Sequence, residues 1–161
     1  MPLLDIAQRQ NDGWLSRETI EYVAEYLNMP IIKVMEIVTF YTMYHTEPVG
    51  KHLVQVCTTT PCWLRGSDNI VIACKEIISP EQNTVSEDGL FSWMQVECLG
   101  ACVNAPVVQI NDDYYEDLNE KNTKEILNSL INDKPLKPGS FRGRSNTAPE
   151  KSLNTNGEKH A

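Results

Sequence analysis

Four of the five cysteines in this 161-residue sequence lie in two close pairs, and this arrangement constrains the fold more than any other feature. Four residues separate Cys57 from Cys62, and three separate Cys98 from Cys102. Each pair follows a run of residues typical of a β-strand. The 35 residues between the pairs are enough for one helix and one strand, so both loops can meet at one end of a sheet.

Thiolate ligands with no nearby histidine suit either zinc or an iron–sulfur cluster. Structural zinc sites commonly use tight C-x2-C turns that aim two thiolates at one ion. The wider gaps in this sequence favour a [2Fe-2S] cluster in which each pair holds a different iron, although spacing alone leaves zinc and unrelated buried thiols open. The remaining cysteine, Cys74, shares a predicted helix face with Ile70 and Ile77 and is expected to pack in the core.

The composition argues against several other classes of protein. The net charge of −8 is unfavourable for a general binder of nucleic acid or of anionic membranes, since both use basic surfaces. No apolar run approaches the ~18 residues of a membrane-spanning helix. The start, MPLLDIAQRQ, lacks the pattern of a secretory signal and the number of cysteines is odd, so free thiols in a reducing compartment are expected.

The hydrophobic pattern divides the chain into a helical region, an α/β region and a tail. Residues 1–48 carry apolar side chains at helical spacing and predict helices that start at Pro2, after an N-cap at Ser16, and at Pro30. Residues 49–133 predict the order β–α–β–β–β–α, a small sheet flanked by helices. A thioredoxin-like arrangement fits this order, and so do other α/β sandwiches.

The individual elements of the α/β region follow from alternation and from helical spacing. Strands are expected over 51–57, over 91–98 and in a hairpin that turns at Asp112-Asp113. Helices are expected after an N-cap at Ser67 and over 121–133.

Residues 134–161 differ from the rest of the chain in charge and composition. They hold six basic and two acidic side chains, a net charge of +4, whereas the first 133 residues carry −12. The segment is rich in Pro, Gly, Ser and Asn and almost without apolar periodicity, so it is expected to be an extended or disordered arm. We expect residues 138–161 to be mobile in the free chain and to order against a partner through Arg142, Arg144 and Phe141.

Two segments around the cysteines resemble a known family. CTTTPCWLRGS at 57–67 and ECLGACVNAPVVQIN at 97–111 are similar to the two signature loops of the thioredoxin-like [2Fe-2S] subunit of respiratory NADH–quinone oxidoreductase (complex I). The resemblance extends to PLLDIAQRQNDGWLS, VTFYTMY and KPGSFRGR. It implies an α/β, thioredoxin-like [2Fe-2S] ferredoxin domain after a small N-terminal helical segment and before an extended tail. Members usually carry a further helix before the segment matching PLLDIAQ, so either this start is late or the helical segment is incomplete.

The resemblance also implies a role in electron transfer. Cys57, Cys62, Cys98 and Cys102 would hold one [2Fe-2S] cluster next to a partner subunit that binds FMN and NADH, and the large iron–sulfur subunit would be the second partner. The chain would act within an NADH–quinone oxidoreductase, without a complete active site of its own. Its place would be cytoplasmic and peripheral to the inner membrane, or on the matrix side in a mitochondrion. The alternatives are the equivalent subunit of an NAD-linked hydrogenase or formate dehydrogenase, and a zinc-stabilised interaction module.

Several residues in the cysteine loops have the chemistry to support a cluster. A cluster becomes more negative on reduction, so hydrogen-bond donors beside its sulfurs stabilise it. The hydroxyls of Thr58, Thr59 and Thr60, the N–H groups of the loops and the guanidinium of Arg65 are candidates, and Gly100 allows the second loop to turn tightly. The sequence shows no glycine-rich phosphate loop, so a flavin elsewhere is expected to separate the two electrons of NADH.

Overall fold

Three short helices form the N-terminal part of this computed structural model, which describes residues 1–145 and 147. They are α1 (Pro2–Gln10), α2 (Arg17–Tyr26) and α3 (Ile31–Phe40). The Ser16 side chain accepts a hydrogen bond from the Thr19 backbone N–H at 3.2 Å and caps α2 as predicted, and Pro30 precedes α3. The three helices bury a core of their own, made of Leu4, Leu15, Ile20, Val23, Ala24, Val34, Val38 and Tyr44.

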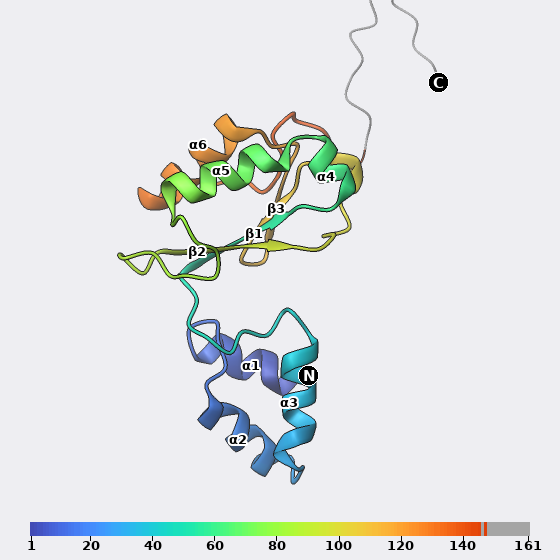
Figure 1. Cartoon of the computed structure of the whole chain (residues 1–161), viewed down its shortest axis with the longest axis vertical. Coiled ribbons are helices and arrows are strands. Elements are labelled where there is room, and N and C mark those ends of the chain that lie inside the picture. The colour runs from blue at the N-terminus through green and yellow to red at the C-terminus, as the bar shows by residue number, and fades with distance from the viewer. Residues whose placement is uncertain (146, 148–161) are drawn as a thin grey trace, which may run out of the picture.

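The remaining elements build a mixed five-stranded sheet with two helices over one face (Figure 1). In chain order they are β1 (His52–Cys57), α4 (Thr60–Leu64), α5 (Ser67–Ile77), β2 (Phe91–Val96), the 3-10 turn η1 (Cys102–Asn104), β3 (Val108–Ile110), β4 (Asp113–Glu116), α6 (Glu120–Ile131) and β5 (Gly139–Ser140). The strand order is β2-β1-β3-β4-β5, in which β1–β2 and β4–β5 are parallel and the other pairings antiparallel. The predicted order of elements is confirmed, with α4, η1 and β5 added to it. Among the described residues, no helix is long and apolar enough to cross a membrane.

The core of this unit lies between the sheet and the helices α5 and α6. Val54 and Val56, alternate residues of β1, are fully buried there beside Trp93 of β2. Trp93 donates its indole N–H to the Ser79 carbonyl at 2.9 Å, so its polar group is satisfied. Cys74 lies in the same core, and burial raises the pKa of its thiol to about 12. Its predicted role as a core residue is confirmed.

Two local details differ from the sequence prediction. Helix α5 begins at Ser67 itself, and its N-cap is Gly66, whose φ of +95° suits a residue without a side chain. The β3–β4 hairpin turns at Asn111 and Asp112 rather than at Asp112-Asp113, because Asp113 already belongs to the strand pairing. Asn111 supplies the left-handed φ of 54° that this turn needs, a conformation that asparagine tolerates well.

The start of the C-terminal segment is ordered, so the prediction of a mobile chain from residue 138 onward is wrong for its first part. Strand β5 adds a parallel neighbour to β4, and Arg144 beyond it forms an ion pair with Asp117 at 2.7 Å. Apolar periodicity in the sequence could not predict these contacts, because they are formed by backbone groups and one ion pair rather than by apolar side chains. The part of the prediction that concerns residues 146 and 148–161 lies outside the described residues.

The helical segment and the sheet unit are linked by an ion pair and by the chain that connects them. Arg9 of α1 donates two hydrogen bonds to the Asp112 carboxylate, at 2.9 and 3.1 Å. Both side chains are exposed, so this pair contributes little to stability. The connecting chain passes close to β2 at Gly50, where the backbone of Phe91 leaves no room for a side chain. The close approach at Gly50 therefore restricts the position of the connecting chain more than the exposed Arg9–Asp112 pair does.

Gly50→Ala is expected to destabilise the fold, because a Cβ at this position would lie 2.2 Å from the Phe91 carbonyl carbon. The Phe91 backbone cannot move away without disturbing the β1–β2 pairing, which begins with His52 opposite Phe91. We expect the free energy of unfolding, measured by urea denaturation, to fall by about 3 kcal/mol or more.

Gly89→Ala is the matched control for this substitution. No atom lies within 4 Å of a Cβ at Gly89, so only the strain of its φ of +71° acts. That strain costs about 1 kcal/mol. Equal losses of stability in the two variants would contradict the close approach at Gly50.

Candidate metal centre

Parallel pairing of β1 with β2 brings the two cysteine loops to the same edge of the sheet, as predicted. Cys57 lies opposite Val96, so β1 ends at the first cysteine and β2 ends two residues before Cys98. Parallel neighbours end on the same side, and both loops leave the sheet together (Figure 1). The ends of the two strands thus place the first thiol of each pair.

The first loop turns back through α4, and this brings Cys62 next to Cys57. Thr59 is the N-cap of α4 and Pro61 lies in its first turn, so the short helix starts directly after the strand. Both residues are no more than 2% exposed, and each thiol influences the pKa of the other. They belong to a small apolar cluster of Cys57, Cys62, Ala105 and Val107. This pair is therefore the buried half of the site.

The second loop holds the exposed half of the site. The Sγ atoms of Cys98 and Cys102 lie 3.3 Å apart, and both residues are exposed. The tight turn predicted at Gly100 is present: its φ is +83°, and its backbone N–H donates to Cys98 Sγ at 3.4 Å. The Tyr114 hydroxyl donates to the Leu99 carbonyl at 2.8 Å and so ties the loop to β4.

The Thr59 hydroxyl links the two pairs. It lies 3.3 Å from Cys57 Sγ and lowers the pKa values of both Cys57 and Cys98. The charge of Cys57 in turn influences the pKa values of both Cys98 and Cys102. The four thiols therefore form one site rather than two separate ones.

Hydrogen bonds make the two buried thiols unequal. Burial alone would raise the pKa of Cys57, but the Thr59 hydroxyl and the backbone N–H groups of Leu99 and Thr59 lower it below its ordinary value. Burial and the adjacent Cys57 thiol raise the pKa of Cys62 to about 12, against the opposing effect of the Val107 backbone N–H. Main-chain N–H groups thus oppose the effect of burial on the pKa of both thiols.

The exposed thiols show the same inequality. The backbone N–H of Gly100 and the Cys102 thiol lower the pKa of Cys98, whereas the hydrogen bond to Cys98 and the charge of Cys98 raise the pKa of Cys102. Ligation of a metal requires every thiol to lose its proton. N–H groups that favour a thiolate also stabilise a ligating sulfur, so this environment suits metal binding.

The other residues predicted to support the site lie along the first loop. The Thr58 backbone N–H donates to β2 at 3.3 Å and continues the strand pairing. Thr60 is exposed in the first turn of α4, and Arg65 is exposed at its C-cap. Their support of a metal centre stays a prediction. Loop N–H groups were expected in general, and those of Leu99 and Val107 act on the thiols, although no side-chain pattern singles out these two residues.

The four thiols lie as two pairs, Cys57 with Cys62 in the apolar cluster and Cys98 with Cys102 at 3.3 Å in the exposed loop. A [2Fe-2S] cluster has two irons and four thiolate ligands. That division matches the pairs Cys57–Cys62 and Cys98–Cys102, so the residues present fit a [2Fe-2S] cluster.

The sequence profile of the family described as thioredoxin-like [2Fe-2S] ferredoxin matches residues 1–131. The chain belongs to this family. Membership confirms the predicted α/β, thioredoxin-like fold class, and the family implies a [2Fe-2S] cluster.

Curated relatives of this ferredoxin match most of its length. An NADH-quinone oxidoreductase subunit of Rickettsia bellii is 59% identical over 133 residues, which cover 83% of this chain and 80% of the relative. The mitochondrial NADH dehydrogenase [ubiquinone] flavoprotein 2 of Dictyostelium discoideum is 46% identical over 139 residues, 86% of this chain and 56% of the relative. The resemblance seen in the cysteine loops is therefore confirmed.

A solved structure shows the same fold in a larger chain. The air-oxidized form of an NAD+-reducing [NiFe]-hydrogenase contains a chain that matches with a TM-score of 0.67 and 16% identity. The match covers 83% of this ferredoxin and 23% of the hydrogenase chain, so the ferredoxin spans about a quarter of that chain. At this identity the likeness concerns the fold alone.

Proposed function

We propose that this ferredoxin holds one [2Fe-2S] cluster on Cys57, Cys62, Cys98 and Cys102 and exchanges single electrons as a subunit of an NADH–quinone oxidoreductase. The observation that carries the proposal is the grouping of four thiols in two pairs at one sheet edge of a thioredoxin-like [2Fe-2S] ferredoxin. Relatives named as an NADH-quinone oxidoreductase subunit and as an NADH dehydrogenase flavoprotein favour this parent complex over an NAD-linked hydrogenase or formate dehydrogenase.

The hydrogen-bond donors around the thiols suit a site that gains negative charge on reduction. When bound, a [2Fe-2S] cluster supplies a one-electron acceptor that becomes more negative on reduction. The backbone N–H of Gly100 donates to Cys98 Sγ, and the Thr59 hydroxyl lies 3.3 Å from Cys57 Sγ. The backbone N–H groups of Leu99 and Val107 act on the pKa values of Cys57 and Cys62 in the lowering direction. Such donors stabilise negative charge on sulfur and so favour the reduced form.

The need for a flavin partner follows from electron counting. NADH releases two electrons as a hydride, whereas a cluster of this type accepts one at a time, so a flavin has to separate them. We assign FMN and NADH to a partner subunit, because this sequence carries no glycine-rich phosphate loop. The large iron–sulfur subunit is the second proposed partner. Within that complex the chain would lie on the cytoplasmic side of the inner membrane, or on the matrix side in a mitochondrion.

Exposed apolar side chains next to the proposed ligands suit contact with such a partner. Trp63 and Leu64 follow Cys62 on α4 and are 56% and 71% exposed, and Val103 follows Cys102 and is 64% exposed. Large apolar side chains that remain exposed beside a site are typical of an interaction surface. We therefore place the electron-exchanging partner at this edge of the sheet.

Replacing any one of Cys57, Cys62, Cys98 or Cys102 by serine is expected to abolish or strongly alter the cluster, because each supplies a quarter of its protein ligands. The measurement is the visible absorption spectrum and the iron content of the reconstituted chain. Cys74→Ser is the matched control, which should keep the spectrum at a modest cost in stability. Loss of the cluster in Cys74→Ser, with retention in one of the other four variants, would contradict the ligand assignment. A wild-type chain that binds zinc and shows no iron–sulfur absorption would favour the zinc module instead.

The isolated, reconstituted chain is expected to accept an electron from dithionite and to leave NADH unoxidised. It has no glycine-rich loop to bind the phosphates of the dinucleotide and no flavin to take the hydride. The measurement is the absorbance of NADH over time, with bleaching of the cluster by dithionite as the positive control. Oxidation of NADH by the pure chain, without any flavoprotein, would overturn the assignment of that step to a partner.

A further inference from the structure

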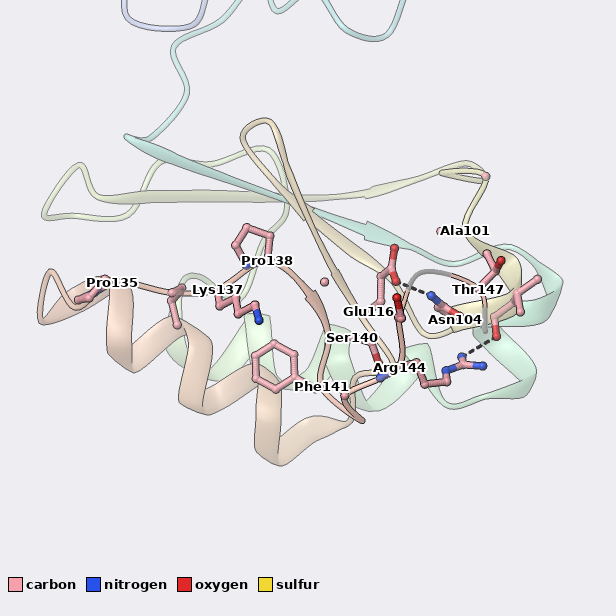
Figure 2. Close-up of a pocket in the computed structure, with 16 residues that line it drawn as sticks. Ala101, Asn104, Glu116, Pro135, Lys137, Pro138, Ser140, Phe141, Arg144 and Thr147 are labelled. Atoms are coloured by element: carbon pink, nitrogen blue, oxygen red, sulfur yellow. Dashed lines mark hydrogen bonds between the residues drawn. The ribbon is translucent and has the colours of Figure 1, made fainter. Parts of the chain in front are cut away.

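One basic side chain of the C-terminal segment packs, largely shielded from solvent, against the second cysteine loop. The Arg144 side chain is 12% exposed and donates through Nη2 to the Val103 carbonyl at 2.8 Å. Figure 2 shows this side chain reaching from the C-terminal segment toward the loop beside Asn104. Val103 directly follows Cys102, so the contact lies one residue from a proposed ligand.

Asp117, directly after β4, holds the same guanidinium from the other side. Its side chain is 1% exposed and accepts hydrogen bonds from Arg144 Nε at 2.9 Å and Nη2 at 2.7 Å. The Ser140 hydroxyl donates to this carboxylate at 2.6 Å. Burial would raise the pKa of Asp117, but the hydrogen bonds from Arg144 and Ser140 lower it below its ordinary value, so the carboxylate is charged at neutral pH. The ion pair is therefore complete and almost fully desolvated.

The main chain of Asp117 is bound to the second loop as well. Its backbone N–H donates to the Asn104 carbonyl at 2.7 Å. The carbonyls of Val103 and Asn104, the two residues that follow Cys102, are thus both held by the Arg144–Asp117 pair. At the other end of the loop, Tyr114 holds the Leu99 carbonyl.

The turn from Cys102 to Asn104 depends on these hydrogen bonds because two of its three residues have little packing. Cys102 and Val103 are exposed, and only Asn104 is buried. A single 3-10 turn has poor internal hydrogen-bond geometry and does not hold its shape alone. Groups outside the loop therefore fix the direction in which the Cys102 thiol points.

We propose that Arg144 is a positioning residue for the metal centre: with Asp117 it fixes the turn that carries Cys102 and thereby the geometry of the exposed thiol pair. This inference rests on the proposed cluster and adds a determinant that lies outside both cysteine loops. Arginine suits the task because its planar fork binds a carboxylate through two N–H groups and still reaches a carbonyl. A lysine ammonium keeps the charge but not this fork.

The test compares the full-length reconstituted wild type with Arg144→Met and Arg144→Lys. Methionine removes the charge and every donor, which leaves the Asp117 carboxylate buried without its cation. We expect iron release to a chelator about tenfold faster in Arg144→Met, since a charged hydrogen bond next to the ligand is lost. The reduction potential and the EPR signal of the reduced cluster should shift, and amide exchange over residues 99–105 should become faster. Arg144→Lys should recover only part of each effect.

Two control variants separate positioning of the loop from other effects. Lys137→Met removes the same charge from an exposed position in the same segment and should leave every readout at its wild-type value. Gly50→Ala weakens the fold at the start of β1, the end of the strand opposite to Cys57, and should leave the potential and the EPR signal unchanged. Loss of global stability alone is thereby distinguished from a change at the site.

Each outcome bears on the proposal. A wild-type potential, EPR signal and amide exchange in Arg144→Met would overturn it, and so would equal shifts in Lys137→Met or Gly50→Ala. If Arg144→Met fails to fold, the Arg144→Lys variant tests the proposal instead. A wild-type reduction potential and EPR spectrum in Arg144→Lys would then overturn the positioning role of Arg144. A wild-type chain that takes up no [2Fe-2S] cluster would contradict the proposed function instead, and amide exchange over residues 99–105 would still test the contact of Arg144 with the loop.

Discussion

The parallel pairing of β1 with β2 is the constraint on which the rest of the structure depends. Because Cys57 lies opposite Val96, both strands end at the same edge and the two cysteine loops leave the sheet side by side. A parallel pair needs a crossover, and α5 lies within it while covering the core face of the same strands. A slip of β1 by one residue would turn Val54 and Val56 away from the helices. The apolar core therefore fixes the register, and the register fixes where the thiols meet.

The thiol site combines a buried pair with an exposed pair, and the protein stabilises them by different means. Cys57 and Cys62 lie among apolar side chains, where a charged sulfur is costly unless it receives hydrogen bonds. The backbone N–H groups of Leu99 and Val107 provide them. The exposed pair lies at the surface with little packing, and its loop is held by hydrogen bonds to carbonyls on either side. The proposed ligands thus combine exposure at the surface with a loop that is held in place.

The sequence predicted those features that side-chain pattern or spacing records. Helix faces, the strands before each cysteine pair, the turn at Gly100 and the place of Thr59 beside the thiols followed from periodicity and residue chemistry. Helix α4 has five residues, too few to show a period, and the Gly66 cap depends on a backbone angle rather than a side chain. The donors of Leu99 and Val107 are main-chain groups that almost every residue carries, so no residue type marks them.

The C-terminal segment shows how few contacts can order a chain that lacks an apolar pattern. Low apolar content predicts disorder, since burial of apolar surface is the usual source of stabilisation. Strand β5, however, joins the edge of an existing sheet, where backbone hydrogen bonds need no periodicity of side chains. Arg144 then finds its acidic partner in Asp117 of the same chain, rather than on the surface of another subunit. One basic side chain of the segment, Arg144, thus forms its ion pair within the chain. The same guanidinium also donates a hydrogen bond to the Val103 carbonyl, next to Cys102.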